Sequence, residues 1–141
     1  MISALKWIAL GSYWTVLTRS LLMTCPWELF SQSLADNPPF DISFEPTSWI
    51  LHLSAYSFLG FLIREAADEK KKLAMGLFVL GFFHSIGCEF LQYLVPGRWP
   101  NVWDAVSNTL GLMLAFGLHK ALRPFLIATF PWRTSRGKLA A

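Results

Sequence analysis

Four long apolar blocks, separated by short polar segments, constrain this chain more than any other feature of its sequence. Of its 141 residues, 54% are hydrophobic and only 15% are charged, whereas about a quarter of the residues are charged in a typical soluble domain. A helix of about 20 apolar residues crosses the hydrocarbon core of a bilayer, so four such helices use about 80 residues and leave only loops and a tail. The composition therefore argues against a water-soluble enzyme and against a disordered chain.

The block boundaries predict an all-α, polytopic integral membrane protein with four transmembrane helices, in one membrane domain over residues 1–141. We expect the spans at about residues 2–25, 48–63, 73–95 and 102–119. The segments between and after them are an acidic, proline-containing outer loop at 26–47, a charged cytoplasmic loop at 64–72 and a tail at 120–141. The tail is partly apolar but is interrupted by Arg123, Pro124 and Pro131, which is typical of a segment lying in the membrane interface.

The distribution of Lys and Arg predicts the orientation of these spans. Residues 64–72 hold four basic residues and residues 120–138 hold five, whereas the loop at 26–47 holds none. Cytoplasmic loops of membrane proteins carry the excess of Lys and Arg. We therefore expect a multi-pass protein with both termini in the cytoplasm. Since the basic residues are confined to short membrane-flanking segments, no nucleic acid partner is expected.

Polar side chains inside the apolar blocks are the candidate functional residues, because each costs several kcal/mol in lipid unless it is paired, hydrated or used. Six of them form helical pairs at a spacing of three or four residues, and two arginines lie near the same ends of the spans. The set is His52, Tyr56, Glu89, Gln92, Asp104, Asn108, Arg98 and Arg19. All of them fall on the side opposite the basic loops, so we expect an outward-facing polar pocket.

A purely structural interpretation of the same residues is also open. They could form a closed hydrogen-bonded network that holds the helices in register, with Asp104 and Asn108 capping the start of the fourth helix. The small residues Ser107, Gly111 and Ala115 recur every four positions, which predicts a helix contact face.

The remaining histidines and the two cysteines give no chemical signature. His84 is expected to be a packed core histidine and His119 an interfacial one. Cys25 and Cys88 lie in or at the edge of apolar blocks and are expected to be buried thiols. No pair of His or Cys has zinc-site spacing, so the sequence predicts neither a metal nor a cofactor.

Three motifs follow one another between about residues 49 and 118. They are His-x-x-x-Tyr at His52, Glu-x-x-Gln at Glu89 leading into a Pro-Gly-Arg turn that ends at Arg98, and Asp-x-x-x-Asn at Asp104. In this combination they resemble the VanZ-like family of small bacterial membrane proteins, named after a protein that gives low-level resistance to the glycopeptide teicoplanin. The resemblance implies a bacterial cytoplasmic (inner) membrane protein linked to the cell envelope, and it covers every candidate residue except Arg19.

The favoured function is a binding module for membrane lipids. Arg98, with Arg19, would hold an anionic lipid headgroup or a lipid-linked cell-envelope precursor. Gln92, Tyr56 and Asn108 would contact its polar substituents. Binding of the precursor would connect the chain to antibiotic resistance, because glycopeptide and precursor meet on the outer face.

Two other functions stay open at this point. In a membrane enzyme acting on a lipid-linked substrate, Glu89 or His52 would be the acid-base group and Asp104 would orient the imidazole. No Gly-x-Ser-x-Gly nucleophile motif supports this alternative. In a structural or assembly protein, the helices would bind another membrane protein, whose identity the sequence does not give, and the polar residues would be internal hydrogen-bonding partners.

Overall fold

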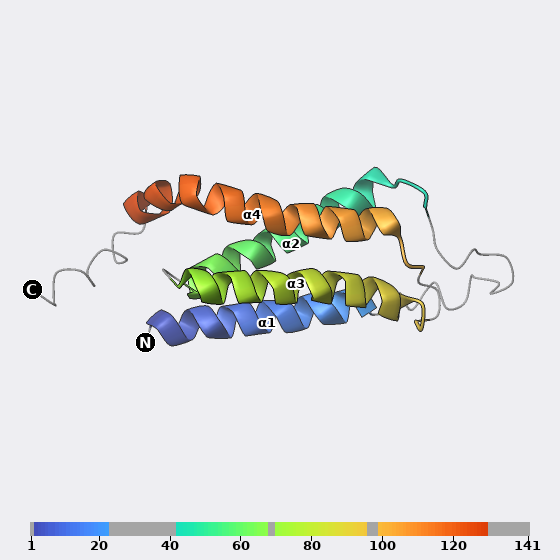
Figure 1. Ribbon diagram of the computed structural model, residues 1–141, viewed down its shortest axis with the longest axis horizontal. Helices are drawn as coiled ribbons and strands as arrows, with labels where there is room; N and C mark the ends of the chain where they lie inside the picture. Colours follow the sequence, from blue (N-terminus) through green and yellow to red (C-terminus); the bar gives the residue numbers. More distant parts are fainter. Residues whose placement is uncertain (1, 23–41, 68–69, 96–98, 130–141) are drawn as a thin grey trace, which may run out of the picture.

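The computed structural model describes residues 2–22, 42–67, 70–95 and 99–129, and these residues are helical over most of their length. The four helices are α1 (Ile2–Leu22), α2 (Pro46–Ala67), α3 (Lys71–Gln92) and α4 (Val102–Thr129). Consecutive helices run in opposite directions in an elongated bundle (Figure 1). Helix α2 crosses the bundle and packs against the other three helices, most extensively against α4.

Several helix ends differ from the expected spans, including the end of α2, which lies at Ala67 rather than near residue 63. Helix α2 begins at Pro46, where proline is favoured because the first helical N–H has no intrahelical partner. Helix α3 ends at Gln92 rather than near residue 95. Helix α4 continues beyond His119 to Thr129 with Pro124 inside it. A proline removes one backbone hydrogen bond and bends a helix, but it does not necessarily end the helix. Residues 120–129 are thus part of α4 rather than a separate segment, and 130–141 lie outside the described residues.

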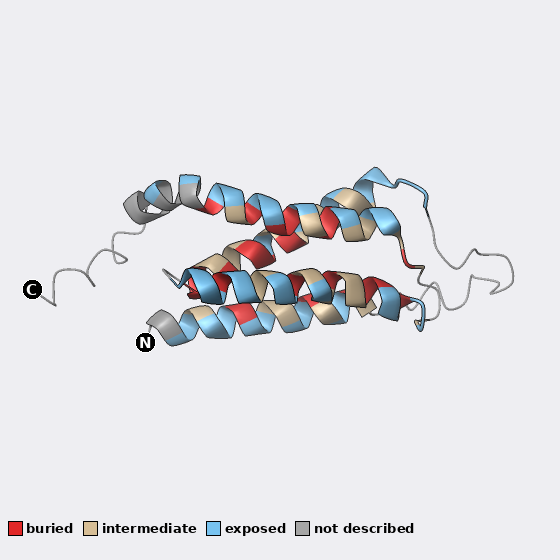
Figure 2. Cartoon of the chain, in the orientation of Figure 1, coloured by how far each residue is buried: buried red, intermediate tan, exposed pale blue. Residues whose placement is uncertain are grey.

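The core lies where α2 faces its neighbours, and the buried residues of each helix line its inward side (Figure 2). Tyr56, Leu59 and Ile63 of α2 and Leu112 of α4 have no exposed surface. Helix α1 contributes apolar side chains to the same core. Among the described residues, the buried polar side chains, such as Glu89 and Asn108, also belong to the helices.

The small residues of α4 form the contact face that their spacing predicts. Ser107, Gly111 and Ala115 are buried against α2. A Cβ atom built on Gly60 of α2 would lie 2.7 Å from the Ala115 Cβ, and one built on Gly111 would collide with the Leu53 carbonyl oxygen. The α2 and α4 backbones approach this closely because neither glycine has a side chain, and the approach brings their polar residues into contact.

The outward surface of the bundle is apolar on all four helices. Large exposed hydrophobic side chains include Leu5, Leu51, Phe83 and Met113, each more than half exposed. Among the described helices, α3 alone is long and apolar enough by its own composition to cross a membrane. The other three helices carry more hydrogen-bonding side chains, which lowers their hydropathy.

Candidate functional site

A group of polar side chains from three helices meets at the end of the bundle where α2 and α4 begin and α3 ends. We call His52, Glu89, Asp104 and Asn108 the His52 cluster. The His52 Nδ1 atom is 3.0 Å from the Asn108 Oδ1 atom and 4.0 Å from the Glu89 Oε1 atom. The His52 Nε2 atom is 3.5 Å from the Asp104 Oδ2 atom. The imidazole therefore lies between two carboxylates and an amide.

Two neighbours fix the carboxylates of this cluster. The Ser48 hydroxyl donates to both oxygens of Asp104, at 3.0 Å each. The Asn101 backbone N–H donates to the Glu89 Oε2 atom at 3.3 Å. Asn101 also caps α4, since its side-chain oxygen accepts from the Trp103 N–H at 2.8 Å. The capping role that the sequence suggested for Asp104 and Asn108 thus belongs to Asn101. The position of this asparagine, just before an apolar helical block, is a signal from which its capping role could have been predicted.

Tyr56 lies deeper in the bundle than the cluster and is fully buried. Its hydroxyl is 3.1 Å from the His84 Nδ1 atom, and the His84 Nε2 atom is 2.8 Å from the Thr18 hydroxyl. Thr18 donates its own proton to the Trp14 carbonyl, so His84 Nε2–H donates to Thr18 and its Nδ1 accepts from Tyr56. His84 therefore links α1, α2 and α3, in agreement with a packed core histidine.

Replacing Tyr56 by phenylalanine is expected to lower the free energy of unfolding by about 1 kcal/mol, because the Nδ1 atom of the partly buried His84 loses its donor. Thermal unfolding of the purified protein in detergent measures the change. Thr15→Ala is the control, because the exposed Thr15 hydroxyl bonds only within its own helix, to the Gly11 carbonyl. Equal midpoints for Tyr56→Phe and the wild type would contradict the assigned hydrogen bond.

The other candidate residues that the structure describes do not join the cluster. Gln92 is buried and donates to the Leu21 carbonyl at 3.2 Å, which ties α3 to α1. Arg19 is exposed on α1. Arg98 and Cys25 lie outside the described residues. Of the eight candidates, the structure thus brings four together from three helices.

The sequence analysis missed a second charged group at the opposite end of the bundle. Glu65 of α2 is 3.1 Å from the His119 Nε2 atom and 3.3 Å from the Lys6 Nζ atom. Glu65 and His119 are both buried. His119 is thus packed between helices at this end of the bundle. Lys6 could have indicated this group, since a lysine inside an apolar block needs a partner.

The His52 cluster also has the donor atoms of a metal site. One imidazole nitrogen of His52 and one carboxylate oxygen each of Glu89 and Asp104 lie within 4.8 Å of one another. Spacing within one helix could not show this, because each of the three residues comes from a different helix.

Comparison with known proteins gives one result for the family. The model of the family described as VanZ/LLP1 matches residues 7–123, which is most of the chain. Searches of curated proteins and of solved structures give no match.

Proposed function

We propose that this chain, which belongs to the VanZ/LLP1 family, crosses the bacterial cytoplasmic membrane with all four helices and binds a lipid-linked cell-envelope precursor. The helices have 21, 22, 22 and 28 residues. At about 1.5 Å per residue, each is long enough for a hydrocarbon core of about 30 Å. Large exposed apolar side chains on all four helices support contact with lipid.

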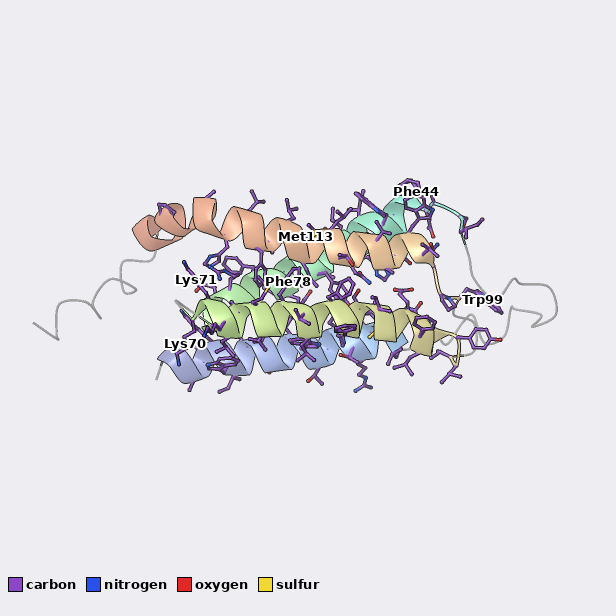
Figure 3. All side chains as sticks on the ribbon, in the orientation of Figure 1. Phe44, Lys70, Lys71, Phe78, Trp99 and Met113 are labelled. Carbon is purple, nitrogen blue, oxygen red and sulfur yellow. The ribbon has the colours of Figure 1, made fainter. Side chains whose placement is uncertain are left out.

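The two ends of the bundle support the orientation with both termini in the cytoplasm. Lys70 and Lys71 lie at one end, and Phe44 and Trp99 lie at the other (Figure 3). The Phe44 ring centroid is 6.1 Å from that of Trp49 and 5.8 Å from that of Trp103. Aromatic groups of this kind favour the membrane interface, and lysines favour the cytoplasmic side. The His52 cluster lies at the aromatic end, so we place it near the outer surface.

The chemistry of the cluster favours a precursor headgroup over a simple phospholipid. Glu89 and Asp104 offer carboxylate oxygens, and the Asn108 Nδ2 atom is buried with no hydrogen-bond partner among the described residues. Such a set binds ligands rich in hydroxyl and amide groups, as sugar-peptide headgroups are. Arg98 keeps its proposed role of binding phosphate. The convergence of these groups from three helices is the observation that carries the proposal.

The test is retention of lipid by the purified chain. Protein extracted in mild detergent is incubated with bacterial lipid extract, and bound lipids are identified by mass spectrometry. We expect Asp104→Asn and Arg98→Ala each to retain about tenfold less precursor than the wild type, which corresponds to about 1.4 kcal/mol. Glu45→Gln, an exposed carboxylate just before α2, is the control. Equal retention by all four proteins would refute the proposal.

One observation favours an enzyme as the second candidate. Asp104 and Glu89 flank the His52 imidazole at 3.5 and 4.0 Å, which is the arrangement of a histidine oriented by a carboxylate for general acid-base catalysis. The substrate would again be a lipid-linked precursor. Glu89→Gln separates the two functions, because loss of precursor turnover with unchanged precursor retention is expected only for an enzyme.

A further inference from the structure

We propose that the His52 cluster is a binding site for a divalent metal ion, with His52, Glu89 and Asp104 as its protein ligands. The three donor atoms lie within 4.8 Å of one another. Two metal-bound donors at about 2.1 Å from the ion are about 3 to 4 Å apart. Side-chain adjustments of about 1 Å would therefore bring all three donors into coordination range.

The hydrogen bonds around the three ligands match those that orient metal-binding side chains. A ligating histidine usually donates its other ring N–H to an oxygen, which fixes the ring and exposes the ligating nitrogen. His52 Nδ1–H donates to the Asn108 Oδ1 atom at 3.0 Å. Ser48 holds Asp104, and the Asn101 backbone N–H holds Glu89. Each proposed ligand thus has a partner that fixes its direction.

The direction of the His52 ring is a separate argument for a cation. A neutral imidazole carries one N–H. With that proton on Nδ1, the unprotonated Nε2 atom faces the Asp104 Oδ2 atom at 3.5 Å. A lone pair facing a carboxylate oxygen is unfavourable unless a proton or a metal ion, with its positive charge, lies between the two atoms. A metal ion bound by both atoms supplies that charge.

The buried Asn108 amide provides a further, independent indication of a ligand. Asn108 has no exposed surface, and its Nδ2 atom has no partner among the described residues. Leaving such a donor without a hydrogen bond costs about 1 to 3 kcal/mol. Because the same amide contacts His52, a ligand at the cluster would be within its reach. A metal-bound water or a headgroup oxygen would satisfy the donor.

The donor set favours the Zn²⁺ and Mn²⁺ class of ion. Imidazole nitrogen together with carboxylate oxygen suits first-row divalent ions, whereas Mg²⁺ and Ca²⁺ prefer oxygen donors alone. Three protein ligands leave a coordination position for an exogenous oxygen. The second part of the inference rests on the proposed function: this position takes a phosphate oxygen of the lipid-linked precursor. The ion would then allow an anionic headgroup to bind beside two carboxylates.

The metal site is tested on the full chain in detergent without added lipid. The protein is stripped with chelator and titrated with Zn²⁺, Mn²⁺ and Mg²⁺ by calorimetry. We expect one Zn²⁺ or Mn²⁺ per chain, weaker binding of Mg²⁺, and at least a hundredfold loss of Zn²⁺ affinity in His52→Gln and Asp104→Asn. Ser48→Ala, which alters only the positioning of Asp104, is expected to lose about tenfold. Glu45→Gln, an exposed carboxylate at the same end of the bundle, should bind as the wild type does.

A second measurement does not depend on whether the variants fold. Pulsed electron paramagnetic resonance of Mn²⁺ bound to the wild type is expected to show coupling to one imidazole nitrogen. Absence of stoichiometric binding, absence of this nitrogen coupling, or unchanged affinity in folded His52→Gln would each overturn the metal site.

Repeating the lipid assay with and without chelator separates this inference from the proposed function. Precursor retention that falls on metal removal and returns with Zn²⁺ or Mn²⁺ supports the bridging role. Retention that needs Asp104 but not the metal overturns the bridging role and leaves the proposed function standing. Stoichiometric metal binding with no precursor retention by the wild type would refute the proposed function and the bridging role, and would leave the metal site standing.

Discussion

Substituting alanine for Gly111 is expected to lower the free energy of unfolding by about 3 kcal/mol or more. The added Cβ would collide with the Leu53 carbonyl oxygen and lie 2.9 Å from the Ser57 backbone nitrogen. Both obstacles are backbone atoms of α2, which cannot move aside as a flexible side chain does. The helices must therefore separate, and the buried surface between them opens. Thermal unfolding in detergent measures the loss, with a midpoint about 10 °C lower than that of the wild type.

The same substitution at Gly117 is the matched control. Gly117 lies in the same helix, but a Cβ there would meet no atom within 4 Å. Alanine is preferred to glycine inside a helix by about 1 kcal/mol, so Gly117→Ala should leave stability unchanged or slightly increase it. A fall in the Gly117→Ala midpoint as large as that of Gly111→Ala would contradict the assignment of the effect to the α2–α4 contact.

Sequence reasoning identified the four helices because their apolar blocks are long and clearly interrupted. Its errors lie at the ends of helices, where apolar and polar residues are mixed. The sequence predicts a separate interfacial tail at 120–141, interrupted by Arg123, Pro124 and Pro131, yet α4 continues through Pro124 to Thr129. A proline costs one backbone hydrogen bond, and the cost decides a helix end only where neighbouring turns contribute little stability.

The residues of the candidate site could be predicted from the sequence, but the contacts that each of them makes could not. Helical spacing places His52 and Tyr56 on one side of α2, but it does not tell how α2 crosses its neighbours. In the structure the crossing directs His52 toward α4 and Tyr56 toward His84. The same limit hid the role of Ser48, since a serine at the polar start of a helix carries no signal until a carboxylate is found beside it.

The group formed by Lys6, Glu65 and His119 shows that the free-energy cost of burying a polar side chain without a partner must be considered for every polar residue in an apolar block. The sequence places Glu65 in the charged cytoplasmic loop expected at 64–72. It is 8% exposed, and its partners Lys6 and His119 come from α1 and α4, which are distant in sequence. Residues adjacent in sequence therefore do not reveal whether a charge near a helix end is solvated or paired.

Replacing Glu65 by alanine is expected to lower the free energy of unfolding by about 3 kcal/mol, at the lower end of the range for breaking a buried ion pair. The value is at the lower end because the Lys6 side chain is 26% exposed and keeps some hydration after the change. The main loss comes from the 5% exposed His119, whose Nε2 atom would no longer contact a carboxylate. Glu45→Ala is the control, because that carboxylate is exposed and its loss should cost less than about 0.5 kcal/mol.

A double-mutant cycle distinguishes pairing from simple loss of packing at Glu65. In Lys6→Met the ammonium group is absent, so a second change at Glu65 removes no ion pair between these two residues. We therefore expect Glu65→Ala to cost about 1 kcal/mol less in the Lys6→Met background than in the wild type. Equal costs in the two backgrounds would show that the 3.3 Å contact between Lys6 and Glu65 contributes no stability. The destabilisation would then come from the other contacts of Glu65, among them the hydrogen bond to His119, which is independent of Lys6.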